Sequence, residues 1–271
     1  MLVANLNGHR IEATEADKGH EYHCPECQSV VVLKKGRIVT HHFAHKPPTD
    51  CRWAKGETRE HLAAKQLFKE EFVGRGLRAE VEHEVKSLPN DRRADVMVWS
   101  PNGTPFALEL QHTPIGYDDL ENRTRSYIRA GVRVIWIPFI RSILWEDAEV
   151  PQSDADGDFI IERFSARPLE RWVNGFNYGR FWMYDPSDSA LWEANLSTHN
   201  IYVPETSWYD SEGNENYAGG YSKPSRRWRK LKLWGPYSLN QVKIGTMKRL
   251  EMKMGNHQYP GGKVGKFVVA D

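Results

Sequence analysis

Two apolar runs joined by a turn-forming segment constrain the fold of this chain more than any other stretch. Residues 93–98 and 106–111 are rich in Val, Leu, Met and Phe, and a Pro-Asn-Gly segment lies between them. Because these turn residues supply backbone angles that strands cannot adopt, the two runs are predicted to pair as neighbouring strands of one meander. Side chains alternate across a strand, so Glu109 and Gln111 share one face, and Asp95 can reach that face from the neighbouring strand.

Two carboxylates and an amide near the ends of adjacent strands suit a hard divalent cation. Mg²⁺ and Mn²⁺ prefer carboxylate oxygens and rarely receive a cage made only of protein. The pattern therefore predicts a metal-dependent phosphodiesterase site at Asp95, Glu109 and Gln111. The competing interpretation is that these residues are solvent-facing polar positions of a half-exposed sheet.

Composition limits the classes of protein to which the chain can belong. It has 271 residues, of which 27% are charged and 39% hydrophobic, and a formal net charge of +1. A nucleic-acid surface must then come from local segregation of charge, because the whole chain is not basic. The sequence has no apolar run of the roughly 20 residues that a membrane helix needs, and no apolar secretory core near residue 1, so a cytoplasmic location without membrane contact is expected. Three cysteines do not suggest a disulfide framework.

The cysteines and histidines of the first 52 residues indicate a small zinc module. A Cys-x-x-Cys knuckle is followed, after one strand-like run, by the segment 41–45, which holds three histidines. Two thiolates and two imidazoles can close a tetrahedron around Zn²⁺, which would stabilise a β module too small to bury a core alone. The expected ligands are Cys24, Cys27, His42 and His45, with His41 and Cys51 as alternates. In the metal-free alternative the cysteines only pack and the histidines lie on the surface.

An amphipathic helix is predicted over residues 57–72, with Thr58 as N-cap. Its apolar stripe consists of Leu62, Ala63, Leu67, Phe68 and Phe72. At four-residue spacing, Glu57, His61 and Lys65 form one polar edge, which is solvated unless it faces the acidic residues of the sheet. A strand at 79–85, a helix at 117–130 and a buried strand at 132–138 complete the order helix, three-strand meander, helix, strand.

This order of elements and motifs resembles the restriction-endonuclease-like (PD-(D/E)XK) nuclease core, and in detail the competence protein CoiA family. The resemblance covers residues from about 20 to 140 and is carried by a series of motifs: Cys24-Pro25-x-Cys27, His42-Phe43-Ala44-His45, Gly56-Glu57-Thr58-x-x-His61 with Lys65, Arg93-x-Asp95, Glu109-x-Gln111, Arg123-Thr124-x-x-Tyr127 and Gly131-x-x-Val134-x-Trp136-Ile137. It implies a mixed α/β (α+β) fold with a small zinc β module in front of a nuclease core that acts in DNA processing.

Carried over residue by residue, the resemblance implies that Asp95 and Glu109 ligate the catalytic Mg²⁺ or Mn²⁺. Gln111 occupies the position of the usual lysine of the family; it is neutral and can orient a water but cannot stabilise a phosphorane by charge. Lys65, or a second metal held partly by Glu57, would restore the missing positive charge. His61 would position the substrate or relay a proton, unless it is only a satisfied polar histidine near a helix start.

The second half of the chain gives weaker signals. Residues 151–158 are polar and acidic and are expected to form a boundary loop. The many aromatic residues between 159 and 222 are expected to form core rather than a base-stacking platform. Residues 223–234 hold six basic residues, two tryptophans and no acid, so they are predicted to bind DNA, with a solvated basic face as the alternative. The candidate contacts are Lys223, Arg226, Arg227, Trp228, Arg229, Lys230 and Lys232.

Together these signals predict three regions: a zinc-finger-like module at 1–52, a nuclease core at 53–150 and an aromatic-rich C-terminal region at 151–271 that binds DNA or a partner. The expected function is that of a divalent-metal-dependent deoxyribonuclease, an endonuclease of recombination, repair, phage or defence. The main rival is a DNA-binding protein of the same fold that has lost turnover because Gln111 replaces lysine. In a third interpretation the chain is an assembly component whose zinc module and Trp-rich half make protein contacts.

Overall fold

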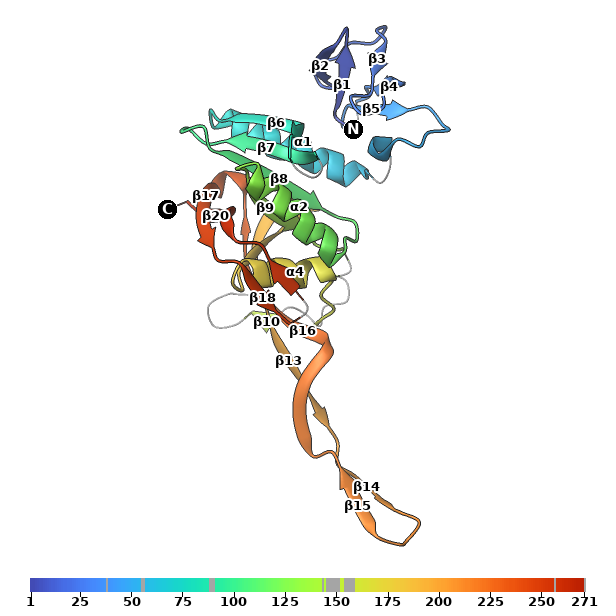
Figure 1. Ribbon diagram of the computed structural model, residues 1–271, viewed down its shortest axis with the longest axis vertical. Coiled ribbons are helices and arrows are strands. Elements are labelled where there is room, and N and C mark those ends of the chain that lie inside the picture. Colours follow the sequence, from blue (N-terminus) through green and yellow to red (C-terminus); the bar gives the residue numbers. More distant parts are fainter. Residues whose placement is uncertain are drawn as a thin grey trace.

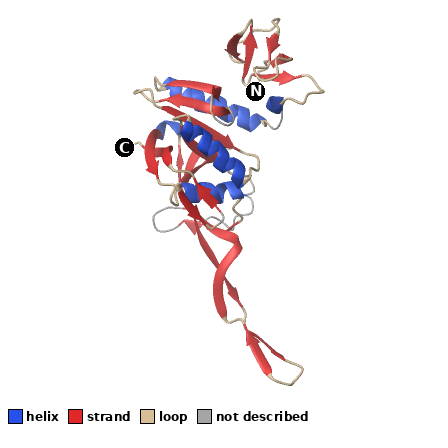
Figure 2. Ribbon diagram, in the orientation of Figure 1, coloured by secondary structure: helices blue, strands red, loops and turns tan. Residues whose placement is uncertain are grey.

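The computed structural model describes residues 1–37, 39–54, 57–87, 91–142, 144, 152–153, 159–255 and 257–270. In this part of the chain, strands predominate, and the helices α1, α2 and α4 pack against them (Figure 1, Figure 2). None of the helices in these residues is long and apolar enough to cross a membrane.

The N-terminal module is a five-stranded antiparallel sheet in the order β2-β1-β3-β4-β5. Its strands are β1 (Val3–Leu6), β2 (His9–Glu12), β3 (Tyr22–His23), β4 (Val30–Lys34) and β5 (His42–His45), and the short 3-10 helix η1 (Arg52–Ala54) follows. Asn7 and Gly8 have φ angles of 52° and 82°, which gives the two-residue turn that a β1–β2 hairpin requires. Buried Val3, Tyr22 and Phe43 belong to a core that continues into the next sheet.

The central sheet has the order β6-β7-β8-β9, and it bears out the predicted succession of helix, three-strand meander, helix and strand. Its elements are α1 (Arg59–Gly74), β6 (Arg78–Val85), β7 (Arg92–Trp99), β8 (Pro105–Gln111), α2 (Tyr117–Arg129) and β9 (Arg133–Pro138). The first three strands are antiparallel, and β9 lies parallel to β8. Helix α1 covers one face and α2 the other: Phe68 packs with Val96 and Leu108, whereas Leu120 belongs to a second cluster with Ala107.

Helix α1 begins as the sequence predicts, but its buried face includes more residues than the predicted apolar stripe. The Thr58 hydroxyl accepts a hydrogen bond from the His61 N–H at 3.2 Å. Ala63, expected in the buried stripe, is exposed, and Ala64 is buried in its place. His61 and Lys65, expected on a polar edge, are buried at 7% and 0% exposure, because that edge faces charged side chains of the sheet rather than solvent.

The C-terminal region packs onto the central sheet. A five-stranded sheet in the order β10-β11-β16-β13-β12 consists of β10 (Gln152–Ser153), β11 (Phe159–Phe164), β16 (Tyr221–Tyr237), β13 (Ala190–Val203) and β12 (Phe181–Asp185), with α4 (Pro168–Phe176) against it. A parallel bridge between Phe139 and Tyr184 joins the end of β9 to β12. Of the expected boundary loop at 151–158, residues 152–153 form β10 and the others lie outside the described residues.

Half of the aromatic residues between 159 and 222 are core, so the expectation holds for part of the set. Phe164, Trp172, Phe176, Phe181, Trp182, Tyr184 and Trp192 are all buried. Six others are exposed: Tyr178, Tyr202, Tyr217, Tyr221, Trp208 and Tyr209. The last two lie on the short hairpin of β14 (Thr206–Tyr209) and β15 (Glu215–Ala218), at the end of a long arm formed by β13 and β16 (Figure 1).

The chain closes with two short hairpins that return to the body. The 3-10 helix η2 (Leu239–Gln241) precedes β17 (Val242–Arg249), which pairs with β20 (Gly262–Val269), and β18 (Met252–Met254) pairs with β19 (His257–Tyr259). Phe267 of β20 joins the core on the α1 side, and Tyr259 joins the core on the α2 side. The central sheet is thus supported on both faces by residues from the last part of the chain.

Candidate active site

An irregularity in β6 brings an additional carboxylate to the α1 face of the central sheet. Glu82 has a φ angle of 49°, which is uncommon for a residue with a side chain. Regular alternation would turn Val81 and Glu82 to opposite faces. Instead, Val81 packs in the core beneath α1, and the Glu82 carboxylate lies 2.6 Å from the Nζ of Lys65, which α1 carries. The left-handed backbone at Glu82 therefore places both side chains under α1.

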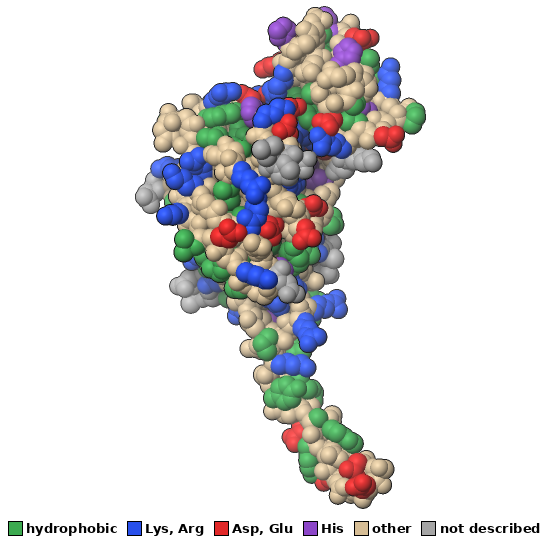
Figure 3. All heavy atoms as spheres, viewed as in Figure 1, with side chains coloured by type: hydrophobic (Ala, Val, Ile, Leu, Met, Phe, Trp, Pro, Cys, Tyr) green, Lys and Arg blue, Asp and Glu red, His purple; other side chains and the backbone are tan. Residues whose placement is uncertain are grey.

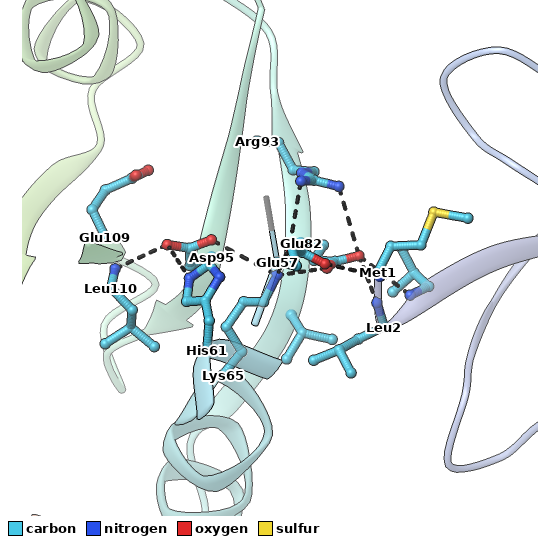
Figure 4. A network of polar contacts seen from close by, with 12 residues as sticks. Met1, Leu2, Glu57, His61, Lys65, Glu82, Arg93, Asp95, Glu109 and Leu110 are labelled. Atoms are coloured by element: carbon cyan, nitrogen blue, oxygen red, sulfur yellow. Dashed lines mark hydrogen bonds and ion pairs between the residues drawn. The ribbon is translucent and has the colours of Figure 1, made fainter. Parts of the chain in front are cut away.

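Lys65 is the centre of a buried charge network between α1 and the sheet (Figure 4). Its ammonium group donates to Glu57 and Glu82 and lies 3.9 Å from Oδ1 of Asp95. Burial alone would lower the pKa of Lys65, but Glu82 and Glu57 outweigh it and raise this pKa above its ordinary value. Arg93 lies 3.6 Å from Glu57 and 3.9 Å from Glu82, and its guanidinium lies over the ring of Trp53.

The network also joins the N-terminal module to the central sheet. The second oxygen of Glu82 accepts hydrogen bonds from the backbone N–H groups of Leu2 at 2.9 Å and Val3 at 3.3 Å. The amino group of Met1 lies 2.8 Å from Glu57 Oε2. Burial alone would raise the pKa of Glu57, but Lys65 and the Met1 amino group lower it below its usual range. The same carboxylates thus bind both α1 and the first strand.

Asp95 lies at the edge of this network and remains ionised. Its Oδ2 accepts a hydrogen bond from the Leu110 N–H at 2.9 Å and lies 3.3 Å from Nε2 of His61. Burial acts to raise the pKa of Asp95, but His61 and Lys65 outweigh it and hold this pKa well below its ordinary value. The His61 ring contacts the rings of His112 and Phe139, with centroid distances of 4.5 Å and 6.1 Å.

Glu109 has a different environment, although β8 lies next to β7. Glu109 is fully buried, and its two carboxylate oxygens accept hydrogen bonds from Arg123 and Tyr127 of α2. Its carboxylate is set apart from that of Asp95 (Figure 4). Burial raises the pKa of Glu109, against the opposing effect of Arg123. The side-chain amide of Gln111 donates to the carbonyl and hydroxyl oxygens of Thr113, at 2.8 Å and 3.0 Å.

A cleft of about 580 Å³ lies where the N-terminal module meets the central sheet. Four of the residues predicted as catalytic line it: Glu57, His61, Asp95 and Gln111. Lys65 and Glu109 do not line it. Its basic lining residues come from both parts of the molecule: Arg52, Lys86, Arg92, Arg93 and Arg123. An ionised Asp95 is therefore reached through an opening with several cationic side chains, an arrangement that can hold a phosphate.

The donor set at this cleft fits Mg²⁺ or Mn²⁺ only after one change of partners. Asp95 is ionised and lines the cleft, as a ligand must. Both oxygens of Glu109 are occupied by Arg123 and Tyr127, so Glu109 has to release one of these donors before it binds a cation. Among the described residues, the one cluster of three or more potential ligand residues lies elsewhere, in the N-terminal module.

That cluster consists of Cys24, Cys27, His45 and Cys51, whose ligand atoms all lie within 4.8 Å of one another. Three thiols and one imidazole suit a tetrahedral structural zinc site. The structure thus brings together three of the four expected ligands and the alternate Cys51. His42 is not in the cluster; its Nδ1 contacts the carbonyl of Thr40 at 2.9 Å.

Strand geometry explains this choice of ligands. His42 and His45 both lie on β5, and residues three apart on a strand point to opposite faces. A His-x-x-His pair on a regular strand therefore cannot direct both rings at one ion. The alternate His41 is also outside the cluster, with its Nε2 3.2 Å from the carbonyl of Gly36.

Comparison with family models matches two adjoining parts of the chain. Residues 6–54 match the N-terminal domain of competence protein CoiA, and residues 57–167 match its nuclease-like domain. This chain belongs to the competence protein CoiA family. Searches of curated proteins and of solved structures found no match.

Of the residues that line the cleft, Pro25, Glu26, Arg52 and Trp53 lie in the part that matches the CoiA N-terminal domain, and all the others lie in the part that matches the nuclease-like domain. This match indicates a nuclease-related role. Glu82, Arg93, Arg123 and Tyr127 belong to the observed site but not to the predicted one. The spacing of Arg123 and Tyr127 could have revealed that pair, because residues four apart on a helix share one face. Glu82 gave no such signal, since its place depends on a left-handed backbone within a strand.

In this CoiA-family protein the basic run predicted to bind DNA lies on β16, where the arm leaves the body on the side away from the N-terminal module (Figure 1). Lys223, Arg226 and Arg227 are exposed. Trp228, Arg229, Lys230 and Lys232 are half-buried. Lys230 lies 2.7 Å from Glu162, so part of its charge is neutralised within the chain.

Proposed function

We propose that this protein is a divalent-metal-dependent deoxyribonuclease, an endonuclease whose active site is the cleft at Asp95. The observation that carries the proposal is an ionised, cleft-lining aspartate with basic side chains around it, inside a nuclease-like domain. Asp95 and Glu109 would hold Mg²⁺ or Mn²⁺, which when bound lowers the pKa of a water and neutralises charge on the phosphate.

The side chains around Asp95 have separate tasks in this scheme. If Glu109 released Arg123 in order to hold the cation, this guanidinium, which lines the cleft, would be available to bind the phosphate and would compensate for the neutral Gln111. His61 lies beside Asp95 and either orients the substrate or takes up a proton. Lys65 is buried against Glu57 and Glu82, so it acts by fixing the position of the acidic residues rather than by touching DNA.

The test is cleavage of linear, circular and single-stranded DNA with Mg²⁺, Mn²⁺ or EDTA. Asp95→Asn keeps the shape of the side chain and removes its charge, so cleavage is expected to fall by about 100-fold or more. Asp118→Asn is the matched control, because Asp118 is exposed on α2 and does not line the cleft. Cleavage that persists in EDTA, or that is equal in both variants, would contradict the proposal.

A second candidate is a DNA-binding protein that does not cleave. It is favoured by Gln111 at the position of the usual lysine and by the Arg123 and Tyr127 bonds that hold Glu109. In this case DNA binds the parent and Asp95→Asn proteins with a salt-dependent affinity, and none of the substrates is cut with either metal.

For the N-terminal module we propose a structural Zn²⁺ held by Cys24, Cys27, His45 and Cys51. Metal analysis of the purified protein is expected to give about one Zn²⁺ per chain. Cys51→Ala should lose the ion, and His42→Ala should retain it, because the His42 ring lies outside the cluster. Loss of zinc from His42→Ala but not from Cys51→Ala would overturn this ligand set.

A further inference from the structure

The arm carries two surfaces of opposite chemistry. We call residues 201–221 the tip and residues 223–230 of β16 the stem. Within the arm, β13 runs antiparallel to β16, from Thr198 paired with Arg229 in the stem to Val203 paired with Tyr221 in the tip. The tip projects away from the body into solvent (Figure 1), and from residue 201 to 210 it spans roughly 30 Å.

The tip is a defined structure rather than a loose loop. Asp210 closes its turn by accepting hydrogen bonds from the backbone N–H groups of Glu212 at 3.0 Å and Asn214 at 2.9 Å. Where the tip bends, Gly219 has a φ of 97°, and a Cβ there would lie 1.9 Å from the carbonyl oxygen of Pro204. The backbone that carries its exposed side chains is therefore held in a defined turn.

The surface of the tip combines exposed aromatic rings with negative charge. Five large aromatic side chains are 49% to 69% exposed: Tyr202, Trp208, Tyr209, Tyr217 and Tyr221. Four exposed carboxylates lie among them, and the sequence has no Lys or Arg between Arg180 and Lys223. A two-stranded ribbon is marginal in water by itself, and an exposed apolar surface of this kind marks an interaction site. The negative charge selects a positively charged partner and not DNA.

The stem is such a positively charged surface, and it lies on the same arm (Figure 3). Lys223, Arg226 and Arg227 are exposed, and the ion pairs found in the described part of the chain do not include them. Arg171 adds a further guanidinium, which donates to the backbone carbonyls of Arg226 and Arg227. Burial lowers the pKa of Arg229, and the positive charge of Arg171 lowers it further.

We propose that two copies of this chain associate through their arms, the acidic aromatic tip of each lying against the basic stem of the other. The tip does not lie against its own stem, because the β14–β15 hairpin points away from the body at the far end of the arm (Figure 1). Two antiparallel arms about a two-fold axis bring each tip to the partner stem, so every contact occurs twice. This inference does not depend on the proposed nuclease activity.

The test is sedimentation velocity of the full chain with charge-reversed variants. The parent is expected to form a dimer that weakens between about 50 mM and about 500 mM NaCl. Glu205→Lys with Glu212→Lys reverses the tip, and Arg226→Glu with Arg227→Glu reverses the stem; neither pair includes the turn-forming Asp210. Each double variant is expected to raise the dimer dissociation constant by about 100-fold, because like charges then face each other.

An equimolar mixture of the two double variants is the decisive experiment, because each reversed surface then meets a surface of opposite charge. The mixture is expected to recover dimers, all of them containing one chain of each kind. Glu15→Lys with Glu70→Lys, which changes the charge equally on exposed sites far from the arm, should remain dimeric. Circular dichroism checks that each variant is folded.

Three results would overturn the proposal. They are a parent chain that is monomeric at low salt, a mixture of reversed variants that stays monomeric, and dimerisation that survives both reversals. If the parent is monomeric and only the stem reversal weakens DNA binding, the stem belongs to DNA, as its composition alone predicts.

Discussion

Asp95 and Glu109 lie on adjacent strands of one sheet, yet their surroundings shift their pKa values in opposite directions. Asp95 faces α1, lines the cleft and is held ionised by His61 and Lys65. Glu109 faces α2, is sealed from the cleft, and has a pKa raised by burial. Residue type and strand position therefore do not fix the chemistry of an acidic pair; the face of the sheet and the helix that covers it do.

The two faces also differ in how charge is balanced. The carboxylates of Glu57, Glu82 and Asp95 surround Lys65, and Arg93 supplies a second positive charge beside Glu57, so the charges are balanced by a network. Around Glu109 there is a closed pair with Arg123, completed by the Tyr127 hydroxyl. A network tolerates the loss of a peripheral member better than the loss of its centre, whereas a pair depends on both members.

The largest expected effect is the removal of that centre. Lys65→Met should lower the free energy of unfolding by about 3–5 kcal/mol, because Glu57 and Glu82 would remain buried without their main counter-charge. Urea-induced unfolding at neutral pH measures this value. Lys69→Met, on the same helix but partly exposed beside Glu12, should cost about 1 kcal/mol or less.

A double variant separates lost charge pairing from lost packing. Lys65→Met with Glu82→Gln removes one of the stranded negative charges, so it should be more stable than Lys65→Met alone. If the two proteins unfold at the same urea concentration, the network does not carry the stability assigned to it.

The second prediction concerns the opposite directions in which the two pKa values move. The folded pKa of Asp95 is lowered, so its ionised form contributes stability above its unfolded pKa of about 4, and this contribution is lost as pH falls. The folded pKa of Glu109 is raised, so its contribution is greatest below about pH 4 and declines as pH rises toward the folded value.

Asp95→Asn and Glu109→Gln should therefore show opposite pH dependence. Over the range from about pH 3 to about pH 7, the stability lost in Asp95→Asn relative to the parent should shrink as pH falls below about 4, and the loss in Glu109→Gln should shrink as pH rises above about 4. Urea unfolding of the three proteins across that range checks both slopes. Parallel slopes would mean that the two faces do not differ electrostatically.

A smaller effect is expected from the hydroxyl on the Glu109 side. Tyr127→Phe removes one donor from a buried carboxylate, while Arg123 remains, so the free energy of unfolding should fall by about 1–2 kcal/mol. Tyr117→Phe is the matched control on the same helix, since the Tyr117 ring packs against His257 at a centroid distance of 4.1 Å. Equal losses in both variants would show that removal of a tyrosine hydroxyl in general, not loss of the bond to Glu109, is responsible.

Much of the fold could be predicted because local rules and tertiary structure agree. The alternation of residues 93–98 and 106–111 around a turn gave the β7–β8 pair, and Thr58 gave the start of α1. The mixed α+β architecture and the CoiA family followed from the order of such elements and motifs. Each of these signals lies within one segment of sequence.

The features that escaped prediction depend on exceptions or on contacts between distant segments. Glu82 lies in the site because of a positive φ angle, which the neighbouring sequence does not predict. Cys51, predicted only as an alternate ligand, joins Cys24 from the segment between β5 and η1, whereas the His42 spacing suggested a ligand that strand alternation excludes. The pairing of Asp95 with His61, and the isolation of Glu109, depend on which helix covers each face.

The smallest predicted effect tests how the start of α1 positions the Asp95 side. Thr58→Ala removes the hydroxyl that accepts from the His61 N–H and should lower the free energy of unfolding by about 1 kcal/mol. Thr58→Ser keeps a capping hydroxyl and should behave like the parent. Because Glu57 and His61 flank this cap, the Ala variant should also reduce cleft activity, whereas the Glu109 side, which α2 supports, should be unaffected. A Thr58→Ala protein that loses stability but keeps the full pH contrast between Asp95 and Glu109 would show that the network, rather than the helix start, fixes the position of Asp95.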